Sequence, residues 1–273
     1  MMRISFVALA VLATSCSVAH AQIALPGAPT ESQSPTPAPP KADGQKGEKS
    51  EKRTKSSLTS SPHSIADKVL RLNGSQGQFL LSDHDKVLHI EKLSLSGEVI
   101  SDPSRKCLID IVADAPIETK SLGKPDGLPR FEAEIPACTF TFDVLDGAVL
   151  APPQDRACVF QAADCQATPA GLWGPDPTTL HSDAKAIGRQ RLRADAAAER
   201  TLRAIQTKLK GQPDADAITR EDGDLAARRA EVCHDYVQEA TYAFCASRMA
   251  QARAAYMKAR LDSLKKKPSA DQD

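Results

Sequence analysis

Between residues 65 and 160 apolar residues alternate with polar ones, which is the period of strands that bury one face. The alternation appears in separate short runs: Leu88 and Ile90, Leu93 and Leu95, Cys107 to Ile111, Phe131 to Ile135, and Phe140 to Val144. We therefore expect a small antiparallel β domain over residues 65–160, built as a sandwich or barrel-like sheet of about six to eight strands.

Turn-forming dipeptides separate these runs and mark where the chain should reverse. They are Asn73-Gly74, Ser96-Gly97, Asp126-Gly127 and Asp146-Gly147. Asp146-Gly147 is the best hairpin candidate, because a strand ending at Leu145 and another starting at Ala148 would flank it.

Helical spacing replaces the alternation after Cys158–Pro177, a stretch that we expect to be a short disulfide-rich bridge. One apolar stripe has intervals of three or four residues and ends before Gly211 and Pro213: Ala194, Ala198, Leu202, Ile205, Leu209. Two further stripes follow, around Val232 and around Met249. The pattern predicts an α+β protein in which a disulfide-braced helical hairpin or three-helix bundle (161–265) follows the β domain, before a disordered tail (266–273).

The first 21 residues have the pattern of a secretory signal peptide. Arg3 precedes an uncharged run, Ile4 to Ala13, that is too short to span a bilayer core of about 30 Å, and Ala19-His20-Ala21 supplies small residues for cleavage. Within this segment Leu12 to Cys16 resembles a lipobox. The expected location is periplasmic or secreted, and a lipoprotein anchored at Cys16 is the alternative.

Residues 22–64 have the composition of a disordered linker, with seven prolines, many Ser and Thr, and a basic run from Lys41 to Lys55. Such a segment cannot bury enough apolar area to offset its chain entropy. A solvated tether is the favoured interpretation, and contact of the basic run with anionic lipid or peptidoglycan is the alternative.

Net charge and aromatic content exclude a nucleic-acid partner. The chain has 35 basic and 35 acidic residues and only seven Phe, three Tyr and one Trp, so it offers neither a basic footprint nor a stacking surface. The resulting net charge of zero, however, is the sum of segments with opposite charge. Residues 65–160 hold ten basic and fifteen acidic side chains, and residues 181–265 hold sixteen basic and twelve acidic ones. Either the two halves dock on each other, or one of them meets a charged partner.

Six cysteines remain after removal of the signal segment, and in an oxidising compartment they predict three disulfides: Cys107, Cys138, Cys158, Cys165, Cys233, Cys245. Sequential pairing is favoured. Cys233 and Cys245 would lie about 18 Å apart on one unbroken helix, too far to bond, so their pairing requires a turn near Glu239 to Tyr242. There is no CxxC motif, and we predict no metal site and no cofactor.

Catalytic patterns are weak throughout the chain. It has neither HExxH nor GxSxG, and with every cysteine paired no thiol nucleophile remains. Asp83-His84-Asp85 is a possible metal ligand set but is better explained as a solvated turn, and the pairs Glu132/Glu134 and Asp143/Asp146 resemble a glycosidase dyad only in composition. We predict no catalytic residues and expect that the protein is not an enzyme.

The spacing of arginines and cysteines in the helical part carries a family resemblance. Arg229 lies four residues before Cys233, and Arg248 and Arg253 lie three and eight residues after Cys245. With Leu225 at an aromatic position of the motif, residues 164–264 resemble the LprI-type lysozyme-inhibitor family. Trp173 stands where that family usually has a second cysteine.

The resemblance implies a helical, disulfide-braced envelope protein, and lysozyme inhibition is known for some members of the family. In the favoured interpretation Arg229, Arg248 and Arg253 tie the helices together through carboxylates such as Glu231, Asp235 or Glu239.

These features predict a non-catalytic, exported binding protein whose partner is an unknown envelope protein or a lysozyme. A structural cell-envelope protein, tethered to membrane or peptidoglycan, is the alternative. Two residues are candidate binding groups: Asp126, at the tip of a loop that could act as a wedge, and Trp173, which is otherwise expected to fill the junction between the halves.

Overall fold

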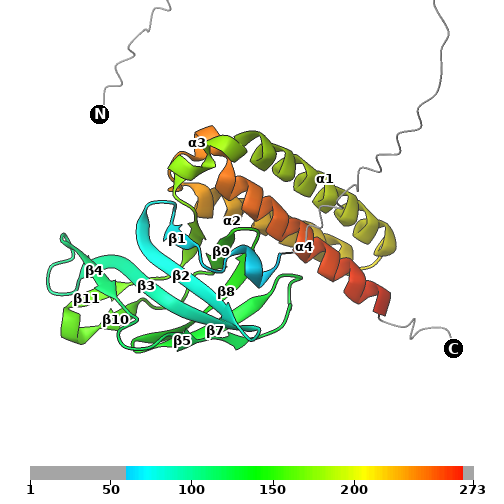
Figure 1. Ribbon diagram of the computed structural model, residues 1–273. Coiled ribbons are helices and arrows are strands. Elements are labelled where there is room, and N and C mark those ends of the chain that lie inside the picture. Colours follow the sequence, from blue (N-terminus) through cyan, green and yellow to red (C-terminus); the bar gives the residue numbers. More distant parts are fainter. Residues whose placement is uncertain (1–59, 267–273) are drawn as a thin grey trace, which may run out of the picture. The chain divides into compact units, whose positions relative to one another are not determined.

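The computed structural model describes residues 60–266 (Figure 1). The predicted signal segment with Cys16, the linker as far as residue 59 and the tail from residue 267 lie outside the described residues. Within this range an antiparallel sheet is followed by helices, which confirms the α+β class.

The sheet has twelve strands, more than the alternation predicted, and every named pair is antiparallel. Its strands are β1 (Val69–Leu72), β2 (Gln76–His84), β3 (Val87–Val99), β4 (Lys106–Asp110), β5 (Ile117–Glu118), β6 (Lys120–Ser121), β7 (Arg130–Ile135), β8 (Cys138–Leu145), β9 (Ala148–Ala151), β10 (Cys158–Phe160), β11 (Cys165–Ala167) and β12 (Gly171–Gly174). Along the sheet the order is β10-β11-β3-β2-β1-β12-β9-β8-β7-β6, with β4 and β5 also paired to β3.

The sheet continues past the expected boundary at residue 160. Strand β12 lies in the middle of the strand order, between β1 and β9, although its sequence Gly-Leu-Trp-Gly shows no alternation. Three of its four residues are buried, because the sheet covers one face and the helices the other, and the period-2 signal is lost when both faces are buried.

Two of the predicted turns show how the same dipeptide type can serve different purposes. The Asp146-Gly147 hairpin is confirmed, since Leu145 pairs with Ala148. The Ser96-Gly97 turn is wrong, because Gly97 lies within β3, paired to both Cys107 and Ala167. A Cβ at Gly97 would lie 2.0 Å from the Gln166 carbonyl oxygen, so the glycine permits a close backbone approach.

Aromatic side chains fill the core inside the sheet. Phe79 is fully buried and meets Phe142 and Trp173 edge-on, at centroid distances of 5.6 and 5.4 Å. The short strand β5 lies against β7 as well as pairing with β3, so the sheet curves around this core.

The helices are η1 (Pro62–Ser64), η2 (Gln161–Ala163), η3 (Pro177–Asp183), α1 (Ala184–Lys208), α2 (Asp214–Cys233), α3 (Glu239–Tyr242) and α4 (Phe244–Lys266). Helix α1 packs along α4, and α2 contacts both (Figure 1). The predicted stripe on α1 is borne out, with Ala194, Ala198 and Ile205 fully buried. A second apolar cluster joins helices to sheet and includes Leu145, Leu172 and Phe244.

The last residues of the expected linker belong to the folded part. Ile65 is fully buried and Ser60 nearly so. The Ser64 hydroxyl donates to the Leu145 carbonyl at 3.0 Å and accepts from the Gly147 amide at 3.2 Å. Residues 60–64 were therefore wrongly included in the predicted linker on the basis of their polar composition, because Ser64 binds them to the β8–β9 hairpin.

All six predicted cysteines are paired, but sequential pairing is wrong for four of them. The disulfides are Cys107–Cys165, Cys138–Cys158 and Cys233–Cys245. Strands β4 and β11 both pair with β3, which brings Cys107 and Cys165 together, so strand register decides the partners rather than chain distance. For Cys233–Cys245 the expected turn exists as the short helix α3, between Gln238 and Ala243, both with positive φ.

Three disulfides are typical of an oxidising extracellular or periplasmic environment. None of the helices within residues 60–266 combines the length and apolar character that crossing a bilayer requires.

Candidate functional site

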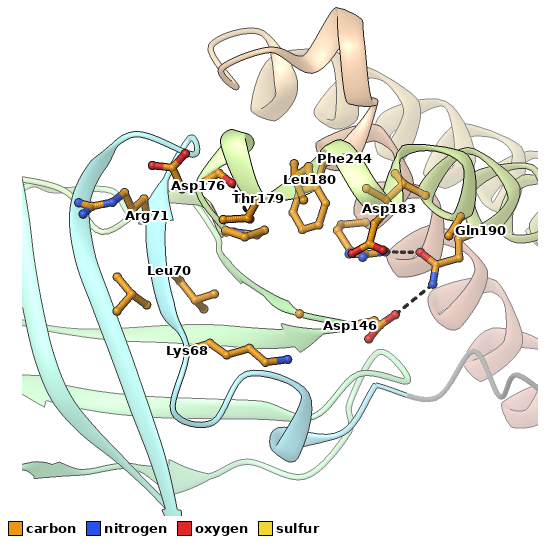
Figure 2. Close-up of a pocket in the computed structure, with 16 residues that line it drawn as sticks. Lys68, Leu70, Arg71, Asp146, Asp176, Thr179, Leu180, Asp183, Gln190 and Phe244 are labelled. Atoms are coloured by element: carbon orange, nitrogen blue, oxygen red, sulfur yellow. Dashed lines mark hydrogen bonds between the residues drawn. The ribbon is translucent and has the colours of Figure 1, made fainter.

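A cleft of about 660 Å³ opens where strand β1 and the β8–β9 turn face η3, α1 and α4 (Figure 2). Its charged and polar lining comes from these elements and the residues directly before them: Lys68, Arg71, Asp146, Asp176, Thr179, Asp183, Gln190, Arg248. Apolar side chains such as Leu70, Ile187 and Phe244 form the rest of the wall. The cleft therefore combines a low-dielectric wall with groups of both signs.

Arg248 is the most unusual residue of this cleft, because it is only 6% exposed. Its guanidinium lies over the Phe244 ring, 4.6 Å from the centroid, and its Nη1 donates to Gln190 Oε1 at 3.1 Å. Its Nε has no hydrogen-bond partner, and within residues 60–266 no carboxylate lies within ion-pair distance of it. Burial lowers the pKa of Arg248, although the negative charge of Asp146 opposes this shift.

Gln190 connects the two charged ends of the site. Its carbonyl oxygen accepts from Arg248, and its amide nitrogen donates to Asp146 Oδ2 at a long 3.5 Å (Figure 2). Helix α1 supplies Gln190 and the hairpin turn supplies Asp146, so the sheet and the helices meet at this amide. This arrangement keeps Asp146 near Arg248 without a direct contact between them.

The start of α4, which carries Phe244 and Arg248, is held by two further interactions. Glu239 accepts from the backbone amides of Cys245 and Ala246, both at 2.8 Å, and so caps the helix. Burial raises the pKa of Glu239 despite these hydrogen bonds. The Cys233–Cys245 disulfide ties the same point to the end of α2.

The other residues of the predicted arginine–cysteine motif lie away from the cleft. Arg253 forms a bidentate pair with Asp222, at 2.6 and 2.8 Å, and Arg229 lies 3.5 Å from Asp195. These two arginines do tie helices together, but through Asp195 and Asp222 rather than through the three carboxylates that we expected. Leu225 packs at the edge of a small apolar cluster between the helices.

The structure contradicts a direct binding role for Trp173. Its side chain is fully buried inside the sheet and its indole donates to the Pro169 carbonyl at 2.8 Å, so no ligand can reach it. Asp126 does not stand on a free wedge either. It pairs with Arg130 at 2.8 Å, and its loop lies on α4, where a Cβ on Gly127 would be 2.5 Å from the Ala255 carbonyl oxygen.

Three of the remaining acidic candidates, Asp83, Glu132 and Asp143, are engaged in ion pairs. Asp143 forms a bidentate pair with Arg130, and this hydrogen bond raises the pKa of Arg130. Glu132 lies 3.4 Å from Lys120, and Asp83 lies 3.2 Å from His63. Within residues 60–266 no three His, Cys, Asp or Glu side chains come together as a metal site.

Sequence reasoning named Arg248 only as a motif residue and did not name Gln190 or Lys68. Gln190 and Arg248 are separated by 58 residues, and no local pattern links them. Comparison of the chain with protein-family models, with curated proteins and with solved structures found no match. The resemblance to the LprI-type family therefore stays a prediction.

Proposed function

We propose that this chain is an exported, non-catalytic binding protein whose cleft accepts an anionic group of its ligand. The observation that supports the proposal is Arg248, a buried guanidinium that lines the cleft without a contacting carboxylate. A buried and incompletely paired charge is costly to a fold, and such charges concentrate at functional sites.

An anion in the cleft would offset that cost. Phe244 and the aliphatic wall exclude water from one side of the guanidinium, which strengthens its attraction for a negative group. Lys68, whose ammonium also bonds to the Ser64 carbonyl at 2.8 Å, and Arg71 add further positive charges to the lining of the cleft. The three-helix bundle that we propose for α1, α2 and α4 holds Arg248 and Gln190 in place.

The test is an NMR titration of the chain from Gln22 onward with acetate, glutarate and inorganic phosphate. We expect the Gln190 side-chain amide to shift on addition of at least one of these anions, and Arg248→Met to abolish the shift. Lys258→Met, on α4 outside the cleft, is the matched control and should titrate as wild type. An unresponsive Gln190 amide at roughly 10 mM anion, or an unchanged response in Arg248→Met, would refute this site.

A lysozyme is the second candidate partner, and the acidic excess over residues 65–160 favours it. Several lysozymes are basic, and an acidic surface would steer such a partner by long-range attraction. Glu118 and Glu134 are exposed on this part of the chain. Muramidase rates measured with micromolar protein test the candidate, and unchanged rates would exclude it. Co-sedimentation with peptidoglycan sacculi would instead support the structural, tethered alternative.

A further inference from the structure

Helix α1 carries a row of cations on the face that points away from the protein. Five exposed basic residues occupy it at intervals of three, four or seven positions: Lys185, Arg189, Arg193, Arg200, Arg203. The buried residues Ile187, Ala194, Ala198 and Ile205 lie on the opposite side of the same helix. At 1.5 Å per residue the basic row is about 27 Å long.

The charges of this row are not used inside the protein. Within residues 60–266 none of the five side chains forms an ion pair or a side-chain hydrogen bond. Arg191, which turns toward the neighbouring helices, does pair, with Asp195 at 3.7 Å. Glu199 is the one acidic residue that shares the exposed side, so the row keeps a strong positive excess.

An exposed apolar side chain lies along one edge of the basic row. Leu192 is 71% exposed, the highest value among the exposed large apolar residues of the described chain. The apolar face of α1 is buried against the protein, so Leu192 is the apolar group that its outer face offers to the acyl boundary of a membrane, beside cations that would meet the headgroups.

We propose that the outer face of α1 docks on a membrane surface rich in anionic lipid headgroups. A straight helix presents its cations to a plane all at once, and arginine suits phosphate because its guanidinium donates two parallel hydrogen bonds. Leu192 favours a lipid surface over a soluble acidic polymer, because only the lipid offers an apolar layer below its charges. This surface is separate from the cleft, and α1 packs on α4, α2 and η3 through its other side (Figure 1).

The experiment is co-sedimentation of the chain from Gln22 with vesicles of phosphatidylglycerol and phosphatidylcholine. We expect binding to the mixed vesicles that weakens with salt, and none to pure phosphatidylcholine. The triple variant Arg193→Gln/Arg200→Gln/Arg203→Gln should bind about 100-fold more weakly, since each charge is worth roughly fivefold. Glutamine keeps the helix propensity, so circular dichroism should be unchanged.

The matched control removes three exposed cations of the sheet region: Lys86→Gln/Arg105→Gln/Lys124→Gln. This control variant loses three positive charges, as the α1 triple variant does, and it should keep nearly the full wild-type affinity for the anionic vesicles. Equal weakening in both triple variants would show that only net charge matters and would overturn the proposal. So would wild-type protein that ignores the anionic vesicles, including the case in which it binds soluble polyphosphate instead.

Discussion

Replacing Arg248 by methionine tests whether the charge of Arg248 serves ligand binding or stabilises the fold. The change removes a hydrogen bond to Gln190, worth about 1.5–3 kcal/mol for a charged donor, and a cation–π contact with Phe244, worth about 1–2 kcal/mol. It also removes the desolvation penalty of a side chain that is 6% exposed, which amounts to several kcal/mol. Methionine keeps the packing on the ring. We expect the free energy of unfolding to change by no more than about 1 kcal/mol.

Urea unfolding followed by the fluorescence of the only tryptophan, Trp173, measures this change directly, because that side chain is buried in the sheet core. Arg253→Met is the matched control on the same helix. Arg253 and Asp222 are 18% and 17% exposed, and removal of the arginine leaves a carboxylate without its partner. This variant should lose about 2–3 kcal/mol. If Arg248→Met lost as much as Arg253→Met, the Arg248 guanidinium would be a structural element and not a ligand-binding charge.

Three other perturbations test the fold. Trp173→Ala should lower the free energy of unfolding by about 3–5 kcal/mol, measured by circular dichroism, and an unchanged melting temperature would contradict the core position. Replacing Cys233 and Cys245 together by serine should cost about 3 kcal/mol for a loop of this length, and a stability equal to that of wild type would show that the bridge constrains nothing. The folded-state pKa of Glu239 is raised by burial, so its protonation favours folding: its contribution is greatest below the unfolded pKa and is lost as the pH rises through the folded pKa. Denaturation at pH 4 and pH 7 should therefore show a larger loss of stability toward neutral pH in wild type than in Glu239→Gln, and equal differences would contradict the shift.

The local sequence pattern was sufficient to predict each feature that depends only on residues close together in the chain. The buried stripe of α1 follows from residues three and four apart, and the Asp146-Gly147 hairpin follows from two adjacent residues with a strand on each side. The break between Cys233 and Cys245 followed from the rise of a helix, because an unbroken helix would hold those two cysteines too far apart.

Features that depend on contacts between distant segments could not be predicted from the local sequence pattern. Gly97 has the dipeptide of a turn but lies within β3, where the backbone of β11 approaches too closely for a side chain. Strand β12 lost its alternation because the sheet covers one of its faces and the helices the other. Arg248 and Gln190 meet across two helices, with Asp146 brought to them by a hairpin of the sheet.

Periodicity, a short turn and an even cysteine count were sufficient to predict the α+β class, the helix stripe, the hairpin and the complete pairing of six cysteines. The choice of cysteine partners, the extension of the sheet to Gly174 and the position of Arg248 in a cleft between sheet and helices follow from the three-dimensional packing alone. The physical reason is the same in each case. Strand register and the packing of helices on a sheet are set by contacts between residues far apart in the chain, and local periodicity does not specify which distant residues those are.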